Sequence, residues 1–165
     1  MAAPRERKHL KDVYPAPAPD GREVCACFRI REASRRISAF YEDALGPTGL
    51  TIAQFSLIGM AVALERQRGE PPTVTTLAAA LDLDRTTLVR NLKPVAAARL
   101  VAIGPGRDRR ARAVRATAAG RAAYRNGLSL WRRAQDGLRA RLGAEPFGLL
   151  MRSLERSVTA LQDQK

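Results

Sequence analysis

Apolar residues recur every three or four positions between residues 22 and 45, and charged residues fill most of the positions between them. This spacing is typical of a helix that buries one face, and Gly46-Pro47 ends it. The next apolar stretch opens with Thr51-x-x-Gln54, a capping-box pattern that predicts a second helix to about Arg68. Because apolar residues mark two sides of this second helix, we expect it in the middle of the core.

Two shorter helices follow, joined by a very short link. Thr75 is a candidate cap for the first of them, and Asp84 for the second, which runs to about Ala98. Two helices joined by so short a turn form a candidate helix-turn-helix. Pro94 lies inside the second helix and removes one backbone hydrogen bond, so it kinks or shortens the helix; the pattern leaves both options open.

The second half of the chain predicts a hairpin followed by two long helices. Residues 100–103 and 113–117 are short apolar segments on either side of a Gly-Pro-Gly turn and an arginine-rich loop, a pattern typical of a β-hairpin. Thr117 is a candidate cap for a long helix that Gly143 ends, and a last helix starts near Glu145.

Together these elements predict a mainly helical chain with a small β-wing, that is, a winged helix-turn-helix with N- and C-terminal dimerisation helices. We expect residues 1–20 to form a flexible Pro-rich arm and residues 21–165 a single domain. Within it, residues 51–117 form the DNA-binding lobe. Residues 22–45 and 118–163 form the dimerisation helices, because a core of this size cannot cover all their apolar stripes.

The charge distribution points to a polyanionic partner. The chain has 29 Lys and Arg against 16 Asp and Glu, a net charge of +13. Residues 84–121 hold 10 basic and 2 acidic residues, whereas residues 21–83 hold 7 of each. An abundance of arginine alone would not leave the first helices neutral, so the excess indicates a functional cationic face.

The composition also excludes several classes. The only His is His9, and no phosphate-binding glycine motif occurs, so we expect no enzyme, no cofactor and no metal site. The aromatic residues are only 4 Phe, 3 Tyr and 1 Trp, too few for a base-stacking single-strand binder. The charged N-terminus does not resemble a signal peptide, and the uncharged run at 51–64 is too short for a membrane span. We therefore expect a cytoplasmic protein with reduced thiols.

The helix capped by Asp84 has two distinct faces. At about 100° per residue, Leu88, Leu92 and Val95 form a narrow apolar seam. The opposite side carries Thr86, Arg90, Lys93 and Ala97, flanked by Thr87 and Val89. Arginine suits bidentate contact with guanine, and threonine can donate to a phosphate or touch a thymine methyl. An ordinary wet face would mix acids with bases, but past Asp84 no acid occurs before Asp108, which favours DNA binding.

Three segments resemble the MarR family of bacterial transcription regulators over about residues 24–142: LTIAQFSLI, TVTTLAAALDLDRTTLVRNLKPV and DRRARAVRATAAGR. The most specific part is the wing, with Asp108 and Arg110 in a D-x-R pattern, followed by Thr117 and Gly120 at the family's spacing. One departure is Ala116, where the family usually has Leu, which predicts looser packing of the wing strand.

The resemblance implies a dimeric repressor that reads pseudo-palindromic double-stranded DNA and releases it in response to a small phenolic or aromatic acid or an oxidant. It implies that Arg110 enters a minor groove and that Asp108 supports the wing. The full predicted DNA-binding set comprises Arg85, Thr86, Thr87, Val89, Arg90, Lys93, Arg107, Asp108, Arg109, Arg110 and Arg112. An architectural DNA-binding protein without an effector is the alternative.

A ligand pocket is expected between the dimerisation helices and the DNA-binding lobe. Phe28, Arg31, Phe55 and Trp131 are of suitable type, with rings for an aromatic body and an arginine for a carboxylate. Each of these residues is equally explicable as core or surface.

Cys25 and Cys27 lie near the start of the first helix among arginines, a setting that favours the reactive thiolate. Peroxide-sensing members of the family resemble this chain in having a Cys near the first helix, so a thiol-based redox sensor is a second alternative. Two helical residues at this spacing point about 200° apart, which disfavours a disulfide between them if the segment is helical. The other interpretation is that both are small apolar residues on a packed helix.

Overall fold

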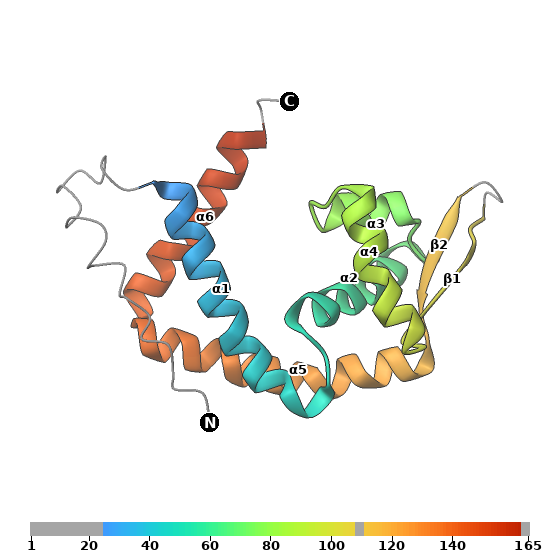
Figure 1. Cartoon of the computed structure of the whole chain (residues 1–165), viewed down its shortest axis with the longest axis horizontal. Coiled ribbons are helices and arrows are strands. Elements are labelled where there is room, and N and C mark those ends of the chain that lie inside the picture. The colour runs from blue at the N-terminus through green and yellow to red at the C-terminus, as the bar shows by residue number, and fades with distance from the viewer. Residues whose placement is uncertain (1–24, 108–110, 163–165) are drawn as a thin grey trace, which may run out of the picture. The chain divides into compact units, whose positions relative to one another are not determined.

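The computed structural model describes residues 25–107 and 111–162. The predicted arm at 1–20 lies outside them. The elements in chain order are α1 Ala26–Leu45, the short 3-10 turn η2 Gly46–Thr48, α2 Ile52–Arg68, α3 Val74–Ala80, α4 Arg85–Ala97, β1 Val101–Pro105, β2 Arg112–Ala116, α5 Ala118–Leu142 and α6 Ala144–Gln162 (Figure 1). The predicted fold class, mainly helical with a small β-wing, is confirmed. The chain divides into two compact units, Met1–Ala39 and Phe40–Lys165.

Local signals set most of the helix ends. Thr51 and Gln54 form the predicted capping box, with N–H to side-chain distances of 3.1 and 3.2 Å. Asp84 and Thr117 cap α4 and α5 as predicted, and Gly143 ends α5. The prediction of Thr75 as the cap of α3 is wrong. Thr73 accepts the Thr76 N–H at 3.1 Å instead, because Val74 is already in the first turn and buried in the core.

The core of the second unit lies around α2. Phe55, Leu57, Ile58, Ala61 and Leu64 are all buried, as expected for a helix with two apolar sides. On α4, the predicted seam of Leu88, Leu92 and Val95 is exposed by 0 %, 1 % and 1 %. Fully burying each such side chain contributes about 1.5–3 kcal/mol, so the seam fixes which face of α4 points outward.

The wing is an antiparallel hairpin in which Val101 pairs with Ala116 and Pro105 with Arg112. It extends beyond the lobe formed by α2, α3 and α4 (Figure 1). The Val114 N–H donates to the Pro72 carbonyl at 2.8 Å, which ties β2 to the start of α3. Ala116 is 2 % exposed and belongs to the core, so the base of the wing is closed over this smaller side chain.

The junction of α4, the wing and α5 is tightly built. α4 continues through Pro94 to Ala97, and Arg99 follows with a positive φ of 57°. The Thr117 hydroxyl donates to the Arg99 carbonyl at 2.8 Å, and the Thr117 N–H donates to the Leu100 carbonyl at 3.0 Å. A Cβ on Gly120 would lie 1.9 Å from that same carbonyl oxygen. The spacing of Thr117 and Gly120 is therefore a packing requirement of the wing base.

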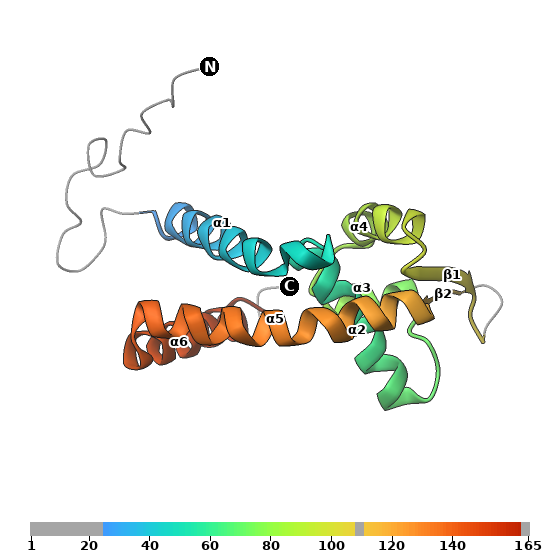
Figure 2. The ribbon, with the colours of Figure 1, turned by 90° about the horizontal axis from the view of Figure 1, so that it is seen from below.

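α5 lies against α2 (Figure 2). It also contacts the last residues of α1, from Phe40 onward, which belong to the second unit. There the Tyr41 hydroxyl donates to the Gln135 side chain, and the Arg141 guanidinium stands 4.6 Å from the Phe40 ring centroid. α6 carries an exposed apolar stripe: Leu149, Leu154, Val158 and Leu161. Within the described residues, no single helix is long and apolar enough to cross a membrane.

Candidate nucleic-acid interface

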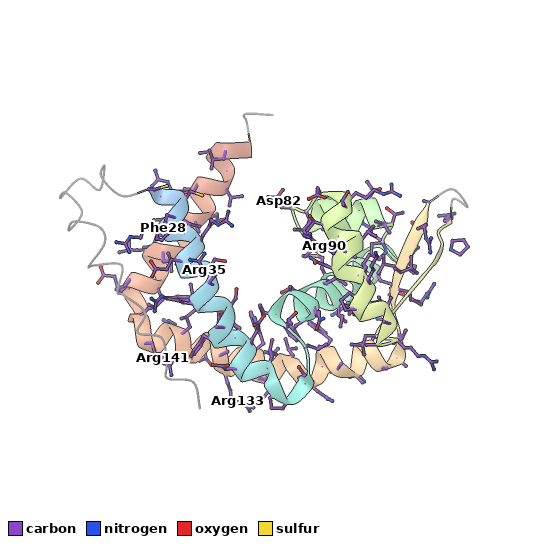
Figure 3. All side chains as sticks on the ribbon, viewed as in Figure 1. Phe28, Arg35, Asp82, Arg90, Arg133 and Arg141 are labelled. Atoms are coloured by element: carbon purple, nitrogen blue, oxygen red, sulfur yellow. The ribbon has the colours of Figure 1, made fainter. Side chains whose placement is uncertain are left out.

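The outward face of α4 presents the side chains that the sequence assigned to it. Arg85, Thr86, Arg90 and Lys93 are exposed, and Val89 is 40 % exposed. Figure 3 marks Arg90 on this helix. Because the buried seam anchors the opposite side, these groups point outward as a set.

Thr87 has a structural role that limits what it can offer a ligand. Its hydroxyl donates to Asp84 Oδ2 at 2.6 Å, and its N–H donates to Asp84 Oδ1 at 2.8 Å. These bonds, the hydroxyl bond first, hold the pKa of the Asp84 carboxyl below its usual range. The hydroxyl proton of Thr87 is therefore engaged in the cap in this structure, and the DNA contact of Thr87 stays a prediction.

A groove of about 440 Å³ separates α4 from the wing. Its apolar floor comes from α3, α4 and β1: Val74, Val89, Leu92, Ala96 and Ile103. Among the described residues, its charged lining consists of Arg85 and Lys93 from α4 and Arg112 from β2, with no acid. We call these three residues and the groove that they line the cationic groove. The structure thus brings three predicted DNA-binding residues from two elements to one concave surface.

The remaining wing residues divide into two groups. Arg107 is exposed two residues after the end of β1. Asp108, Arg109 and Arg110 lie outside the described residues, so their predicted roles stay predictions.

The basic block, residues 84–121, contains two arginines that form ion pairs within the protein. Arg115 and Arg121 both pair with Glu65, at 3.4 and 2.6 Å. The charge pattern along the chain did not indicate this pairing, because Glu65 lies on α2, 50 residues before Arg115 on β2. Among the described residues of the block, the other cations carry no ion pair: Arg85, Arg90, Lys93, Arg99, Arg107 and Arg112.

Of the four predicted ligand residues, two meet in one cavity. Phe55 and Trp131 line a space of about 280 Å³ between α2 and α5, together with Ser56, Gly59, Met60, Ala63, Tyr124 and Leu128. The Phe55 and Tyr124 rings stand 4.9 Å apart between centroids. Tyr124 was not predicted as a ligand residue, although its place on the apolar stripe of the long helix indicated burial. Phe28 and Arg31 are exposed on α1 in the first unit.

Cys25 and Cys27 are both exposed free thiols. α1 begins at Ala26, and the Cys25 carbonyl accepts the Arg29 N–H at 3.1 Å. Cys25 therefore immediately precedes the helix, so the 200° separation, which was stated for a fully helical segment, does not describe this pair. Within the described part of the chain, no group of three or more His, Cys, Asp or Glu could hold a metal ion.

Several solved structures of transcription regulators resemble this chain over most of its length. The transcriptional regulator MosR of M. tuberculosis, crystallised in complex with DNA, is 33 % identical, with a TM-score of 0.73 over 85 % of this chain and 98 % of that one. A MarR-family regulator from Rhodococcus sp. RHA1 is 20 % identical, with a TM-score of 0.64 over 78 % and 88 %. BpsR of Bordetella bronchiseptica is 19 % identical, with a TM-score of 0.69 over 87 % and 98 %. No protein-family profile and no curated protein sequence matches the chain.

The winged helix-turn-helix of this chain and its 33 % sequence identity to MosR both indicate a transcription regulator. The similar structures are transcription regulators, which confirms the expectation of a regulator rather than an enzyme. The chain belongs to the MarR family of transcriptional regulators.

Proposed function

We propose that the chain is a homodimeric repressor that binds pseudo-palindromic double-stranded DNA in the bacterial cytoplasm. The observation that carries this proposal is the cationic groove, in which α4 and the wing present Arg85, Lys93 and Arg112, and the described residues that line it include no acid. Cations gathered on one concave surface suit a phosphodiester backbone. MosR, which shares 33 % of its residues with this chain, was crystallised in complex with DNA, and this supports the proposal.

In this proposal α4 enters the major groove and the wing an adjacent minor groove. Arg90 reads a base edge from the middle of the exposed face, while Lys93 and Arg112 neutralise phosphates. The resemblance assigns Arg110 to the minor groove and Asp108 to its support. Arg109 is expected to contact phosphate, because a flexible cation at the edge of a groove neutralises backbone charge.

The proposal is tested by footprinting on the DNA upstream of the protein's own gene. A repressor of this kind protects two half-sites about one helical turn apart. Uniform protection with no preferred sequence would support an architectural DNA-binding protein and reject this function.

The dimer is supported by the apolar stripe on α6, where Leu154, Val158 and Leu161 are exposed by 36 %, 52 % and 66 %. A second copy is the natural cover for such a stripe. Val158→Asp places a charge on it and is expected to weaken assembly, whereas Arg156→Asp, also exposed on α6, does so less. Sedimentation showing a folded monomer of the wild type at micromolar concentration rejects the dimer.

A small aromatic acid is the proposed effector, and the cavity of Phe55, Tyr124 and Trp131 is its proposed site. Its volume of about 280 Å³ suits a single substituted ring. For comparison, the DNA binding of BpsR is regulated by 6-hydroxynicotinic acid.

A panel of hydroxybenzoates and hydroxynicotinates tests the effector. DNA release by one of them should disappear in Ala63→Leu, which fills the cavity, and persist in Ala53→Leu, an exposed alanine on α2 outside the cavity lining. Equal release in the two variants would exclude this cavity as the site.

An oxidant is the second candidate signal, favoured by the exposure of both thiols at the start of α1. Peroxide should then abolish DNA binding by the wild type and spare the Cys25→Ser, Cys27→Ser protein. Unchanged sensitivity of the double variant would reject thiol sensing.

A further inference from the structure

One carboxylate joins three elements at the base of the wing. Glu65 lies near the end of α2, where its Oε2 accepts from the Arg121 guanidinium on the first turn of α5 at 2.6 Å. Its Oε1 accepts from the Arg115 guanidinium on β2 at 3.4 Å. We call Glu65, Arg115 and Arg121 the clasp, because together they tie α2, β2 and α5 to one another.

Glu65 is the most enclosed member of the clasp. Its side chain is 15 % exposed, against 34 % for Arg121 and 62 % for Arg115. It has two guanidinium partners, whereas each guanidinium has only this one ion pair among the described residues. A half-buried carboxylate between two guanidinium groups is a stronger link than an isolated surface pair. Glu65 is therefore the residue on which the clasp depends.

The clasp acts on the strand that contributes to the cationic groove. On β2, Val114 is buried on the inner face and Arg115 points outward to Glu65, while Arg112 lines the groove. Arg121 lies next to Gly120, where α5 packs on the Leu100 carbonyl at the base of the hairpin. The clasp thus contacts the outer face of the wing through Arg115. It also contacts α5, which packs against the base of the wing, through Arg121.

We infer that Glu65 is a positioning residue for DNA binding. Its carboxylate fixes β2 through Arg115 and the start of α5 through Arg121, and so sets the position of Arg112 relative to Lys93 across the cationic groove. This inference rests on the proposed function, because it requires that the wing contact DNA.

Simple electrostatics predict the opposite effect for a substitution at Glu65. Removing an acid from a DNA-binding protein raises its net positive charge, which by itself strengthens binding to a polyanion. If Glu65 positions the wing, its removal instead weakens binding. The sign of the change in affinity therefore separates the two explanations.

The decisive comparison is Glu65→Gln against Glu70→Gln. Glu70 is exposed and lines a cavity of about 410 Å³ together with Arg115, yet it carries no ion pair among the described residues. Both substitutions change the charge equally and close to the same strand. Fluorescence anisotropy with a duplex selected from random DNA by the wild-type protein is expected to show about three- to tenfold weaker binding for E65Q. E70Q should bind as tightly as the wild type or more tightly. An E65Q protein that behaves like E70Q overturns the inference.

Two further measurements separate positioning from general loss of stability. Hydrogen exchange of the β2 amides should accelerate in E65Q while the amides of α4 keep their protection. Glu65→Asp keeps the charge but shortens the side chain by one methylene, so it should also weaken binding although the net charge is unchanged. Wild-type affinity of Glu65→Asp with unchanged β2 exchange in E65Q would contradict the clasp.

Arg112→Ala distinguishes failure of the inference from failure of the proposed function. If the wing binds DNA, Arg112→Ala weakens the wild type, and it costs less in the E65Q background because the wing is already displaced. No effect of Arg112→Ala on the wild type would reject the proposed role of the wing. A full effect in both backgrounds would reject only the positioning role of Glu65.

Discussion

Gly120→Ala is expected to destabilise the protein because α5 passes so close to the wing base. The new Cβ would lie 1.9 Å from the Leu100 carbonyl oxygen, whereas ordinary contact begins near 3.4 Å, so the two must separate by about 1.5 Å. Overpacking of this kind costs about 1–3 kcal/mol. The move also strains the Thr117 N–H bond to the same oxygen, which contributes about 0.5–1.5 kcal/mol. The better helix propensity of alanine offsets about 0.5–1 kcal/mol, which leaves a net loss of about 2 kcal/mol.

Gly137→Ala is the matched control on the same helix. Its Cβ would stand 3.4 Å from the Phe40 ring, so the propensity gain of about 0.5–1 kcal/mol should dominate. Urea unfolding at fixed protein concentration measures both variants, since the stability of a dimer of the proposed kind depends on concentration. Equal or greater stability of Gly120→Ala relative to Gly137→Ala would refute the close approach of α5 to Leu100.

Three other predictions concern the DNA-binding lobe. Thr73→Ala should cost about 1 kcal/mol of stability by removing the cap of α3, and Thr75→Ala close to nothing; the reverse order in urea unfolding would restore Thr75 as the cap. The lowered pKa of Asp84 means that its cap stabilises α4 above the usual carboxyl range and is lost as the pH falls through the folded pKa. The Thr87 amide followed by NMR should therefore report fraying of α4 in acid, and in Asp84→Asn this titration should vanish. Arg99→Gly should raise the urea midpoint by relieving a left-handed backbone, worth about 1 kcal/mol, and a lowered midpoint would show that the arginine side chain contributes more than the strain.

Local signals in the sequence predicted most of the fold. The capping box at Thr51, the caps at Asp84 and Thr117 and the seam on α4 are decided by neighbours within one or two helical turns, so a single segment contains the information. Thr73 and Thr75 could each cap α3, and the choice depends on the burial of Val74 against other elements. That choice could not be read from the segment alone.

The residue types of the nucleic-acid interface and of the aromatic cavity could be predicted from the sequence, but the ion pairs between elements could not. The cationic face of α4 follows from helical periodicity, and Phe55 and Trp131 were recognisable as aromatic residues on apolar stripes. The pairing of Arg115 and Arg121 with Glu65 was not, because it joins three elements that only the tertiary fold brings together. Counting charges along the chain therefore overstated the number of free cations.

In the proposed mode of binding, Arg90 on α4 reads a base edge while Arg112 on the wing neutralises a phosphate. Arg90→Ala and Arg112→Ala should be compared by fluorescence anisotropy on the selected duplex and on a scrambled one, at several salt concentrations. Arg90→Ala is expected to cost about 1–3 kcal/mol on the selected duplex and much less on the scrambled one. Arg112→Ala should weaken both duplexes alike and reduce the salt slope by about one. An equal loss on the two duplexes for Arg90→Ala would contradict the claim that this helix reads the sequence.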